Sequence, residues 1–339
     1  MNTIDLGTPD LGMHPLHGIH EPTTSTPPRR PGSVRRTSSI DMTRDPGSLD
    51  PVHLCGRARD LMTTHDGTAV EIGQARMRGT VEMLARVVQR IDVEPAVAGM
   101  RLVGAPAMSG FRAAVDATAP QLRQRRDLRY TLLDDVPVAT LISGHALSAS
   151  GALGTAKSGY LPVVDQCAGF VTGGLLMTSF EAGDPAVVTG PPAPSLADAD
   201  DPLAWHEMAT LPVHGMRRRR RLDVRNNGGA PEIEVDAMFC DTYIRADGTE
   251  TIIHEYTVEA VVDSDTQTIL RSQAVARVLP WQECPGAVAS ATRLAGMRLD
   301  QLHFRIRHEL QGTSTCTHLN DLLRSIGDAA ALIALLNTD

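Results

Sequence analysis

The most reactive side chains of this sequence gather in one segment near its C-terminal end. Cys316, His318 and Asp321 stand within six residues of one another, and Cys284 opens the helical stretch before them. A thiol, an imidazole and a carboxylate can act as nucleophile, base and orienting group. The same groups are ligands for zinc or iron. The segment therefore predicts a thiol or metal site, and a structural role for Cys316 next to a helix cap is the alternative.

The spacing within this segment limits a purely local site. Positions i and i+2 of a helix do not face one another, so Cys316 and His318 would pair only through a cap geometry before the helix. His254 stands on an expected strand next to the Asp247-Gly248 turn and is a further candidate. The interpretation that competes with a functional one for His254 is a structural or surface histidine on that strand.

Composition and charge exclude several classes of function. The chain has 32 basic and 40 acidic residues, a net charge of −8 that argues against a general nucleic-acid-binding surface. No apolar run approaches the roughly 18–20 residues that span a bilayer, and the first residues do not resemble a secretory signal. The cysteines are odd in number and widely spread, which is not a disulfide framework. We therefore expect a reduced cytoplasmic protein with no membrane partner, whose cysteines are Cys55, Cys167, Cys240, Cys284 and Cys316.

The elements that would position these residues follow from turn and strand patterns. Asp66-Gly67 predicts a hairpin turn, because both central positions of a type I′ turn require positive φ. In the second half, β-branched alternation around Asp247-Gly248 and Ser264-Asp265 predicts an antiparallel meander of three strands. The final third is expected to be helical. The five arginines at 217–221 are read as a solvated strand start paired with nearby acids, with phosphate binding as the alternative.

Composition shifts divide the chain into four parts. We expect a flexible N-terminal arm at residues 1–33, a first unit at 34–142, a connector at 143–215 and a second unit at 216–339. The connector is rich in Gly, Ala and Pro, and it is too long for an unstructured loop within a compact domain. We therefore expect it to pack over the two units, with Cys167 and the Trp205-His206 pair as buried residues.

The two units share short features in the same order, which predicts an internal repeat. Asp60 precedes Asp66-Gly67 by six residues, and Asp241 precedes Asp247-Gly248 by the same six. The expected fold class is α+β, with two related units that each form a small antiparallel sheet with helices packed on one face.

The two expected units differ in their reactive side chains. Where the second unit has Cys316 and His318, the first has Tyr130 and Leu132. We therefore expect one site per chain, mostly on the second unit, while the first unit supplies packing or one wall of a pocket.

Several motifs resemble a known family. LLDDVPVATLISG, MRRRRRLDV, LPWQEC and especially GTSTCTHLNDLLRSI resemble the bacterial domain of unknown function 2889 family. Members of that family commonly end in a segment like L-x-G-x-x-x-C-T-H-L. The second unit covers the usual domain, and the whole chain looks like a long form. This resemblance implies no established activity.

A second resemblance is to the NifU/IscU-type iron–sulfur scaffold. In that family a first cysteine lies on a strand, a second before an Ala-Ser-rich helix and a third before a last helix. Cys240-Asp241, Cys284 and Cys316 occupy those places in order. The resemblance implies a sheet with helices on one face, and it adds Asp241 to Cys284, Cys316 and His318 as a site residue. At the starts of helices, both cysteines would then lie where the thiolate is favoured.

These observations lead to one preferred functional hypothesis. Asp241, Cys284, Cys316 and His318 are expected to serve as catalytic residues or as ligands of zinc or iron. The protein would be a lyase- or hydrolase-like enzyme that acts on a small apolar or carbonyl-bearing catabolic substrate, with or without a metal ion. The alternatives are a metal- or iron–sulfur-binding accessory or scaffold protein, and an assembly subunit with buried cysteines. Self-association into a homo-oligomer is left open.

Overall fold

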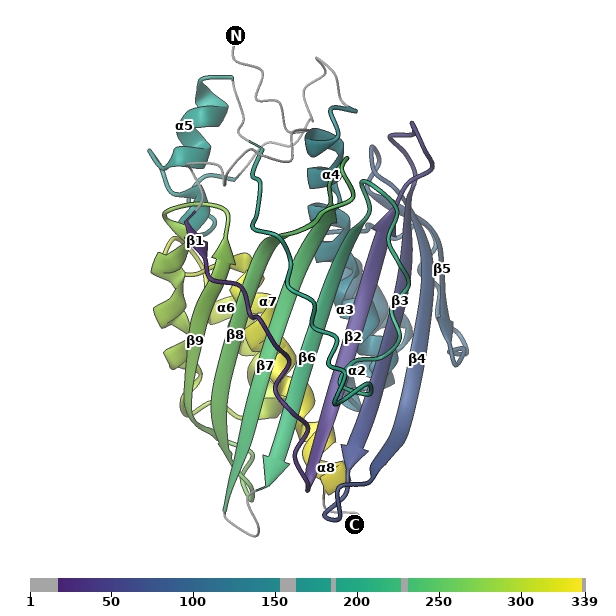
Figure 1. Ribbon diagram of the computed structural model, residues 1–339, viewed down its shortest axis with the longest axis vertical. Coiled ribbons are helices and arrows are strands. Elements are labelled where there is room, and N and C mark those ends of the chain that lie inside the picture. The colour runs from purple at the N-terminus through teal and green to yellow at the C-terminus, as the bar shows by residue number, and fades with distance from the viewer. Residues whose placement is uncertain (1–17, 153–162, 184–186, 227–230, 337–339) are drawn as a thin grey trace.

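The residues that the structure describes form a single antiparallel sheet of nine strands (Figure 1). The structure is a computed structural model, and it describes residues 18–152, 163–183, 187–226 and 231–336. Helices cover one face of the sheet, and extended segments cross the other face (Figure 1). The protein is therefore an α+β protein with one large sheet.

The strand order shows two meanders joined side by side. The order is β1-β9-β8-β7-β6-β2-β3-β4-β5, so β2 to β5 form one meander and β6 to β9 the other. The strands are β1 (Ile19–His20), β2 (Ser33–Thr43), β3 (Val52–Thr63), β4 (Ala69–Glu82), β5 (Val87–Glu94), β6 (Met216–Asn226), β7 (Glu232–Ile244), β8 (Glu250–Asp263) and β9 (Ile269–Leu279).

The two Asp-Gly turns connect strands as predicted. Gly67 joins β3 to β4 with φ 88°, and Gly248 joins β7 to β8 with φ 85°, a conformation that glycine adopts without steric cost. Next to them, Asp66 and Asp247 accept hydrogen bonds from the backbone N–H two residues further on. The predicted hairpin and the predicted meander β7-β8-β9 are both confirmed.

The expectation of two separate small sheets is wrong. β2 and β6 pair antiparallel over nearly their whole length, from Ser33 opposite Arg225 to Met42 opposite Met216. Each meander alone would leave a long edge with unpaired backbone groups. Pairing β2 with β6 satisfies both edges at once and fuses the halves into one sheet.

The helix layer lies on one face of this sheet (Figure 1). The central helix, α3, is buried on nearly every side and packs against β2, β3 and β4, while α7 packs against β7 and β8. The helices are α1 (Phe111–Thr118), α2 (Pro120–Gln124), α3 (Leu128–Ile142), α4 (Gly144–Ala149), α5 (Leu175–Glu181), α6 (Leu302–Glu309), α7 (Thr317–Ser325) and α8 (Ala329–Leu336). The 3-10 helices of the described residues are η1 (Ala168–Phe170), η2 (Cys284–Leu294), η3 (Leu299–Gln301) and η4 (Ile326–Asp328).

Residues 187–213, which we call the strap, cross the opposite face of the sheet (Figure 1). Trp205 of the strap donates a hydrogen bond of 2.8 Å to Thr26, which in turn donates to the carbonyl of Leu196. Residues 18–33 were expected to be a flexible arm. They lie on the sheet, because β1 pairs with β9 and Thr26 donates a hydrogen bond to the strap. Residues 1–17 lie outside the described residues.

The five arginines of β6 are buried, whereas the sequence predicted a solvated strand start. Alternation along the strand sends them to both faces of the sheet. Arg217 bonds Asp41 and the strap carbonyl of Ala209. Arg218 and Arg220 bond Asp135 of α3 on the helix side. The run of like charges is therefore divided between the two covering layers, and Arg217, Arg218, Arg220 and Arg221 form ion pairs with aspartates.

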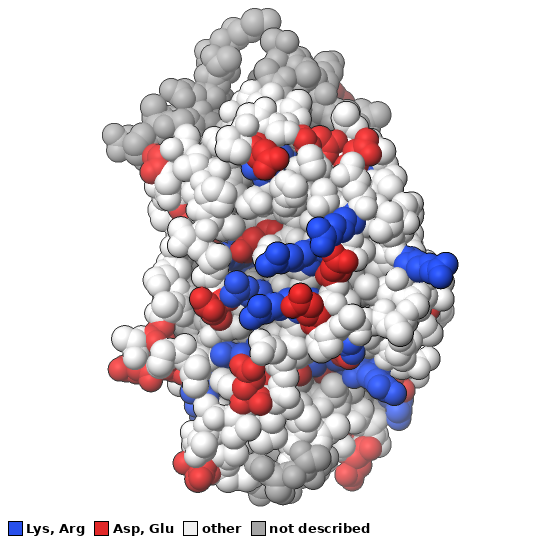
Figure 2. Space-filling view, turned by 90° about the vertical axis from the view of Figure 1, so that its right-hand side faces the viewer, with Lys and Arg blue, Asp and Glu red and all other residues white. Residues whose placement is uncertain are grey.

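The surface along β5 carries interspersed charges. Figure 2 shows basic and acidic side chains next to one another on this side of the molecule. Arg90 and Asp92 form an ion pair of 2.6 Å there. Within the described residues, none of the helices combines the length and the apolar character that crossing a membrane requires.

Candidate metal centre

Asp241 lies on β7 with its side chain fully buried on the helix side of the sheet. Arg218, its partner across the β6–β7 pair, donates from Nη1 to both carboxylate oxygens, at 2.8 and 2.9 Å. Burial by itself raises the pKa of Asp241, but the charges of Arg218 and His254 outweigh it and bring the pKa below its ordinary value. Asp241 is therefore a buried carboxylate.

A β-bulge directs His254 toward Asp241. Ile252 packs with Trp205 under the strap, so regular alternation would send His254 to the strap side as well. However, the β7–β8 register shifts next to Asp241, which leaves Ile253 as an extra residue. As a result Ile253 packs into the core on the α3 side, and His254 also points to that side. Its Nδ1 lies 3.3 Å from Oδ2 of Asp241.

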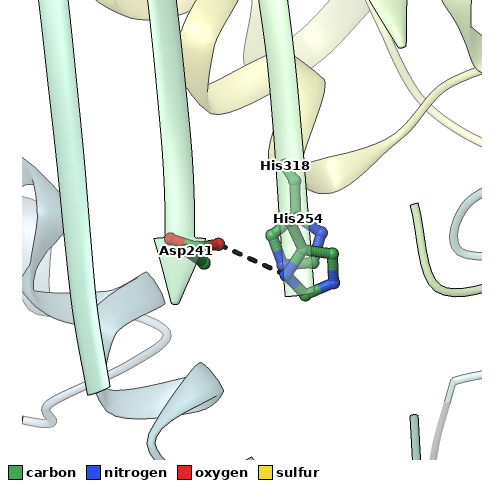
Figure 3. A group of neighbouring side chains, drawn as sticks. All are labelled: Asp241, His254 and His318. Carbon is green, nitrogen blue, oxygen red and sulfur yellow. Dashed lines mark ion pairs between the residues drawn. The ribbon is translucent and has the colours of Figure 1, made fainter. Parts of the chain in front are cut away.

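His318 reaches the same place from the first turn of α7. Its ring stacks on the ring of His254, with the centroids 4.0 Å apart and the planes at 20° (Figure 3). Burial lowers the pKa of His318 to about 3, and the neighbouring His254 contributes to the shift. His318 is therefore a neutral imidazole at pH 7, with a lone pair available for a ligand.

Asp241, His254 and His318 together offer three metal-ligand atoms that lie within 4.8 Å of one another. In the part of the chain that the structure describes, no other group of three or more His, Cys, Asp or Glu side chains meets that distance. Nε2 of His318 is buried and makes no hydrogen bond to described residues, and the buried Nδ1 of His254 has the ion-pair contact with Asp241. Two imidazoles and a carboxylate suit zinc or iron, so these residues fit such an ion.

A network of buried ion pairs holds this group between the sheet and the helices. Arg220 bonds Asp135 of α3, and Arg324 of α7 bonds Asp134 of α3 at 2.7 Å. The ion pairs form two groups, each balanced in charge. Arg218 and Arg220 pair with Asp135 and Asp241, and Arg112 and Arg324 pair with Asp134 and Asp321. A hydrogen bond from Arg220 to the backbone carbonyl of Asp321 joins the two groups into the network.

Asp321 belongs to this network and was considered as the residue that orients His318. It pairs with Arg324 at 2.7 Å and with Arg112 at 3.3 Å. Burial alone raises the pKa of Asp321, but these cations lower it to about 2. Asp321 therefore fixes α7 through arginines.

The predicted cysteines lie in a different place from Asp241 and His318. Cys284 and Cys316 interact electrostatically with each other and with Cys167, and we call these three residues the thiol cluster. The thiol cluster lies in the core with Tyr256, whereas Asp241 and His318 meet His254. The structure therefore divides the predicted four-residue site into two pairs.

The expectation that both helix-start cysteines favour the thiolate is wrong. Burial raises the pKa of Cys316 to about 11, and the nearby Cys167 adds to the shift, although backbone N–H groups of α7 oppose it. Burial also raises the pKa of Cys284 well above its ordinary value. A helix N-terminus contributes only a partial charge, and removal from water outweighs it here.

Cys240, which the scaffold resemblance aligned with the other cysteines, faces the strap side. It packs with Met238 and Trp205, and Arg219 lies 3.8 Å from its sulfur. The strands of the sheet therefore separate Cys240 from the thiol cluster on the helix side.

His254 is the residue of this group that sequence reasoning treated as structural. The signal that would have found it is the Asp247-Gly248 turn. Counting outward from that turn brings His254 within one residue of the position opposite Asp241. The bulge then decides which of Ile253 and His254 occupies the position.

A cavity that Asp241, His254 and His318 do not line adds a histidine that sequence reasoning missed, and this histidine interacts electrostatically with His254. Its volume is about 410 Å³, and His145 of α4 and Tyr243 of β7 line it. The two rings meet edge to face, with centroids 5.1 Å apart. Burial and the charge on His254 lower the pKa of His145 to about 4, so His145 is neutral at pH 7. We find no sequence signal that would have identified His145.

Part of the chain matches a known protein family. Residues 216–332 match a family described as protein of unknown function (DUF2889). This segment contains Asp241, His254 and His318, while His145 and α3 lie outside it. A search of curated proteins found no match.

Proposed function

We propose that Asp241, His254 and His318 bind one zinc or iron ion, and that the protein is a hydrolase- or lyase-like enzyme for a small substrate. One observation carries the proposal: Asp241, His254 and His318 each offer a ligand atom within 4.8 Å of the other two, and Nε2 of His318 is buried without a hydrogen-bond partner among the described residues. Unsatisfied buried polar atoms are costly, and a metal ion would satisfy all three residues at once.

Three protein ligands suit a catalytic site better than a structural one. Structural zinc sites usually have four protein ligands, whereas catalytic sites keep one position for water or substrate. A bound ion of this kind polarises a carbonyl group or lowers the pKa of a bound water molecule. Within the protein, Arg218 fixes the carboxylate of Asp241, and α7 fixes the ring of His318.

The alternative is an accessory protein that binds a metal without turnover. The cavity of about 410 Å³ favours the enzyme, because its volume lies in the range of small-molecule sites. The cavity reaches His145 and Tyr243, and Tyr243 stands two residues after Asp241 on β7. The cavity wall thus comes within two residues of one proposed ligand along β7, although none of the three ligands lines the cavity. Cys284 and Cys316 are not part of this proposal, because burial keeps them as neutral thiols.

We also infer that the two meanders are related units, of which only the second keeps the site. In support, both have a bulge next to an aspartate, Asp60 on β3 and Asp241 on β7. Each aspartate bonds an arginine on the preceding strand of its meander. Gly73 lies opposite Asp60, where His254 lies opposite Asp241. The first unit therefore lacks one imidazole at the corresponding position.

The test is metal analysis of the full-length protein purified without a histidine tag. We expect about one zinc or iron per chain, and His254→Ala or His318→Ala should lower the metal content at least tenfold. His308→Ala is the matched control, because His308 is exposed on α6. Circular dichroism of each variant separates loss of metal from loss of fold.

Turnover is tested with 4-nitrophenyl acetate, a small carbonyl substrate. We expect hydrolysis that disappears on chelation and returns with zinc or cobalt. Metal binding without any hydrolysis would instead favour the accessory protein. Metal content that is unaffected by the two histidine variants would reject the proposed ligand set.

A further inference from the structure

Phe239 lies on β7 two residues before Asp241, and its side chain is fully buried on the helix side of the sheet. Its ring stacks on the ring of His318, with the centroids 6.4 Å apart and the planes at 21°. His318 in turn stacks on His254, with the centroids 4.0 Å apart (Figure 3). The ring of His318 therefore has two ring neighbours, of which His254 is a proposed ligand and Phe239 is not.

The ring of Phe239 also contacts the arginine that binds Asp241. The Cζ atom of Arg218 lies 4.5 Å from the centroid of that ring. Attraction between a cation and an aromatic face is strongest where both are removed from water, and the side chain of Arg218 is fully buried. Nη2 of Arg218 makes no hydrogen bond to a described residue, whereas Nη1 donates to both carboxylate oxygens of Asp241. Contact with Phe239 thus helps to fix the guanidinium on which the carboxylate depends.

We infer that Phe239 is a positioning residue of the metal centre, whose ring fixes His318 directly and Asp241 through Arg218. The inference rests on the proposed function and adds to it a residue that is not itself a ligand. Binding sites need their ligands held within about 0.5 Å of the productive geometry by neighbours whose own conformations are locked by packing. Tyr256 packs against Phe239 with the ring centroids 5.9 Å apart, so the ring itself is held in place.

A buried phenylalanine that only fills the core would have a different effect on the protein. Loss of its ring would lower the free energy of unfolding and leave the geometry of the ligands unchanged. Loss of a positioning ring also changes the affinity for the ion, because residues that orient metal ligands typically contribute about 10–100-fold to that affinity. Measurements of metal affinity on two variants that each lose a buried ring therefore separate the two roles.

The test compares Phe239→Leu with Phe111→Leu in the full-length protein. Phe111 on α1 is as deeply buried as Phe239, but it belongs to a separate cluster of buried residues. In competition titrations with cobalt, Phe239→Leu should lower the affinity about 10–100-fold, and Phe111→Leu should change it less than about threefold. The visible spectrum of bound cobalt reports the ligand geometry, so its bands should shift for Phe239→Leu and stay in place for Phe111→Leu.

Two further variants of Phe239 keep the test decisive if Phe239→Leu does not fold. Phe239→Tyr keeps the ring and should bind cobalt within about threefold of the original affinity. Phe239→Met replaces the ring with a flexible chain and should lose affinity as Phe239→Leu does. Thermal melting checks that each variant is folded. A folded variant without the ring that keeps the original affinity and spectrum would overturn the inference.

A measurement without metal separates this inference from the proposed function. In chelated protein, the nuclear Overhauser effect between the ring protons of His254 and His318 reports how closely the two rings stack. Phe239→Leu should weaken this effect about twofold or more, as a displacement of about 0.5 Å would do, and Phe111→Leu should leave it unchanged. A weaker contact in a protein that binds no cobalt supports the positioning of His318 and rejects the metal centre. Cobalt binding through His318 that is equally tight without the Phe239 ring retains the metal centre and rejects this inference.

Discussion

Nδ1 of His254 lies 3.3 Å from Oδ2 of Asp241, across two strands that one Asp-Gly turn connects. The contact depends on a single extra residue, Ile253, in the β7–β8 pair. Without that bulge, His254 would share the strap side with Ile252. The candidate metal centre is therefore built by the backbone of one hairpin, and α7 adds the third ligand.

Arg218 should be far more important for stability than a surface arginine on the same strand. Arg218→Met removes the buried arginine partner of Asp241 and one of the two arginines that pair with Asp135, although its side chain is replaced by one of similar length. Removing one partner of a buried ion pair costs about 3–5 kcal/mol. We expect a loss of that size in the free energy of unfolding, measured by urea denaturation.

Arg225→Met is the matched control on β6. The partner of Arg225 is the exposed Glu234, and a surface pair contributes less than about 1 kcal/mol. Equal losses for the two variants would show that Asp241 does not depend on Arg218.

Gly169 should tolerate no side chain while Cys284 is present. A Cβ atom at Gly169 would lie 2.8 Å from the sulfur of Cys284. Gly169→Ala should therefore lower the free energy of unfolding by about 1–3 kcal/mol, as overpacking does. In the double variant with Cys284→Ala the clash is absent, so the loss should be smaller than the sum of the two single losses.

Gly286→Ala is the control for this cycle. Gly286 lies on η2 near Cys284, and a Cβ atom there would meet no other atom within 4 Å. Its stability should change by less than about 0.5 kcal/mol. Strictly additive losses for Gly169→Ala and Cys284→Ala would contradict the placement of η1 against the thiol cluster.

One thiol of five should react in the folded protein. Cys55 is exposed, whereas the other four cysteines are buried. Titration with Ellman's reagent should therefore detect one fast thiol in buffer and five in urea. Cys55→Ser should abolish the fast phase. Rapid reaction of two or more thiols in buffer would contradict the burial of the thiol cluster.

His206 should make the protein less stable in acid. It is buried between Ser39 and Thr37, with hydrogen bonds of 2.8 and 2.9 Å, and burial lowers its pKa to about 3 from 6.5. Between those values the unfolded chain binds a proton and the folded protein does not. The free energy of unfolding therefore falls as the pH drops below 6.5, by up to about 1.4 kcal/mol per pH unit for this group.

The comparison with His206→Gln isolates this contribution. The variant should be less stable than the original protein at pH 7.5. The difference between their free energies of unfolding should become smaller by about 2 kcal/mol between pH 6.5 and pH 5. His308→Gln, at an exposed position on α6, should show no such change with pH. If the difference in free energy of unfolding between His206→Gln and the original protein does not change with pH, His206 is not buried as a neutral imidazole.

Local patterns in the sequence predicted the local structure well. Asp66-Gly67 and Asp247-Gly248 marked their hairpins, because the backbone of those turns requires what glycine permits. The segment from Cys316 to Asp321 was expected to begin a helix, and α7 begins at Thr317. These features depend on neighbouring residues, so a single sequence contains the information.

Other features could not be read from the chain in this way. The pairing of β2 with β6 joins residues nearly two hundred positions apart, such as Arg36 and Leu222, and no turn signal specifies it. Burial changed the expected chemistry of Cys316, because a thiol removed from water keeps its proton even at a helix start.

The sequence by itself determined which reactive groups exist and which local elements carry them: Asp241 on a strand, His318 at a helix start, and cysteines before two helices. Only the tertiary structure decided which of them meet. His318 lies close to His254 and Asp241, while the side chain of Cys316 packs in the hydrophobic core. The physical reason is that a bulge and the packing of α7 on β7 and β8 fix side-chain directions, and both depend on contacts between distant parts of the chain.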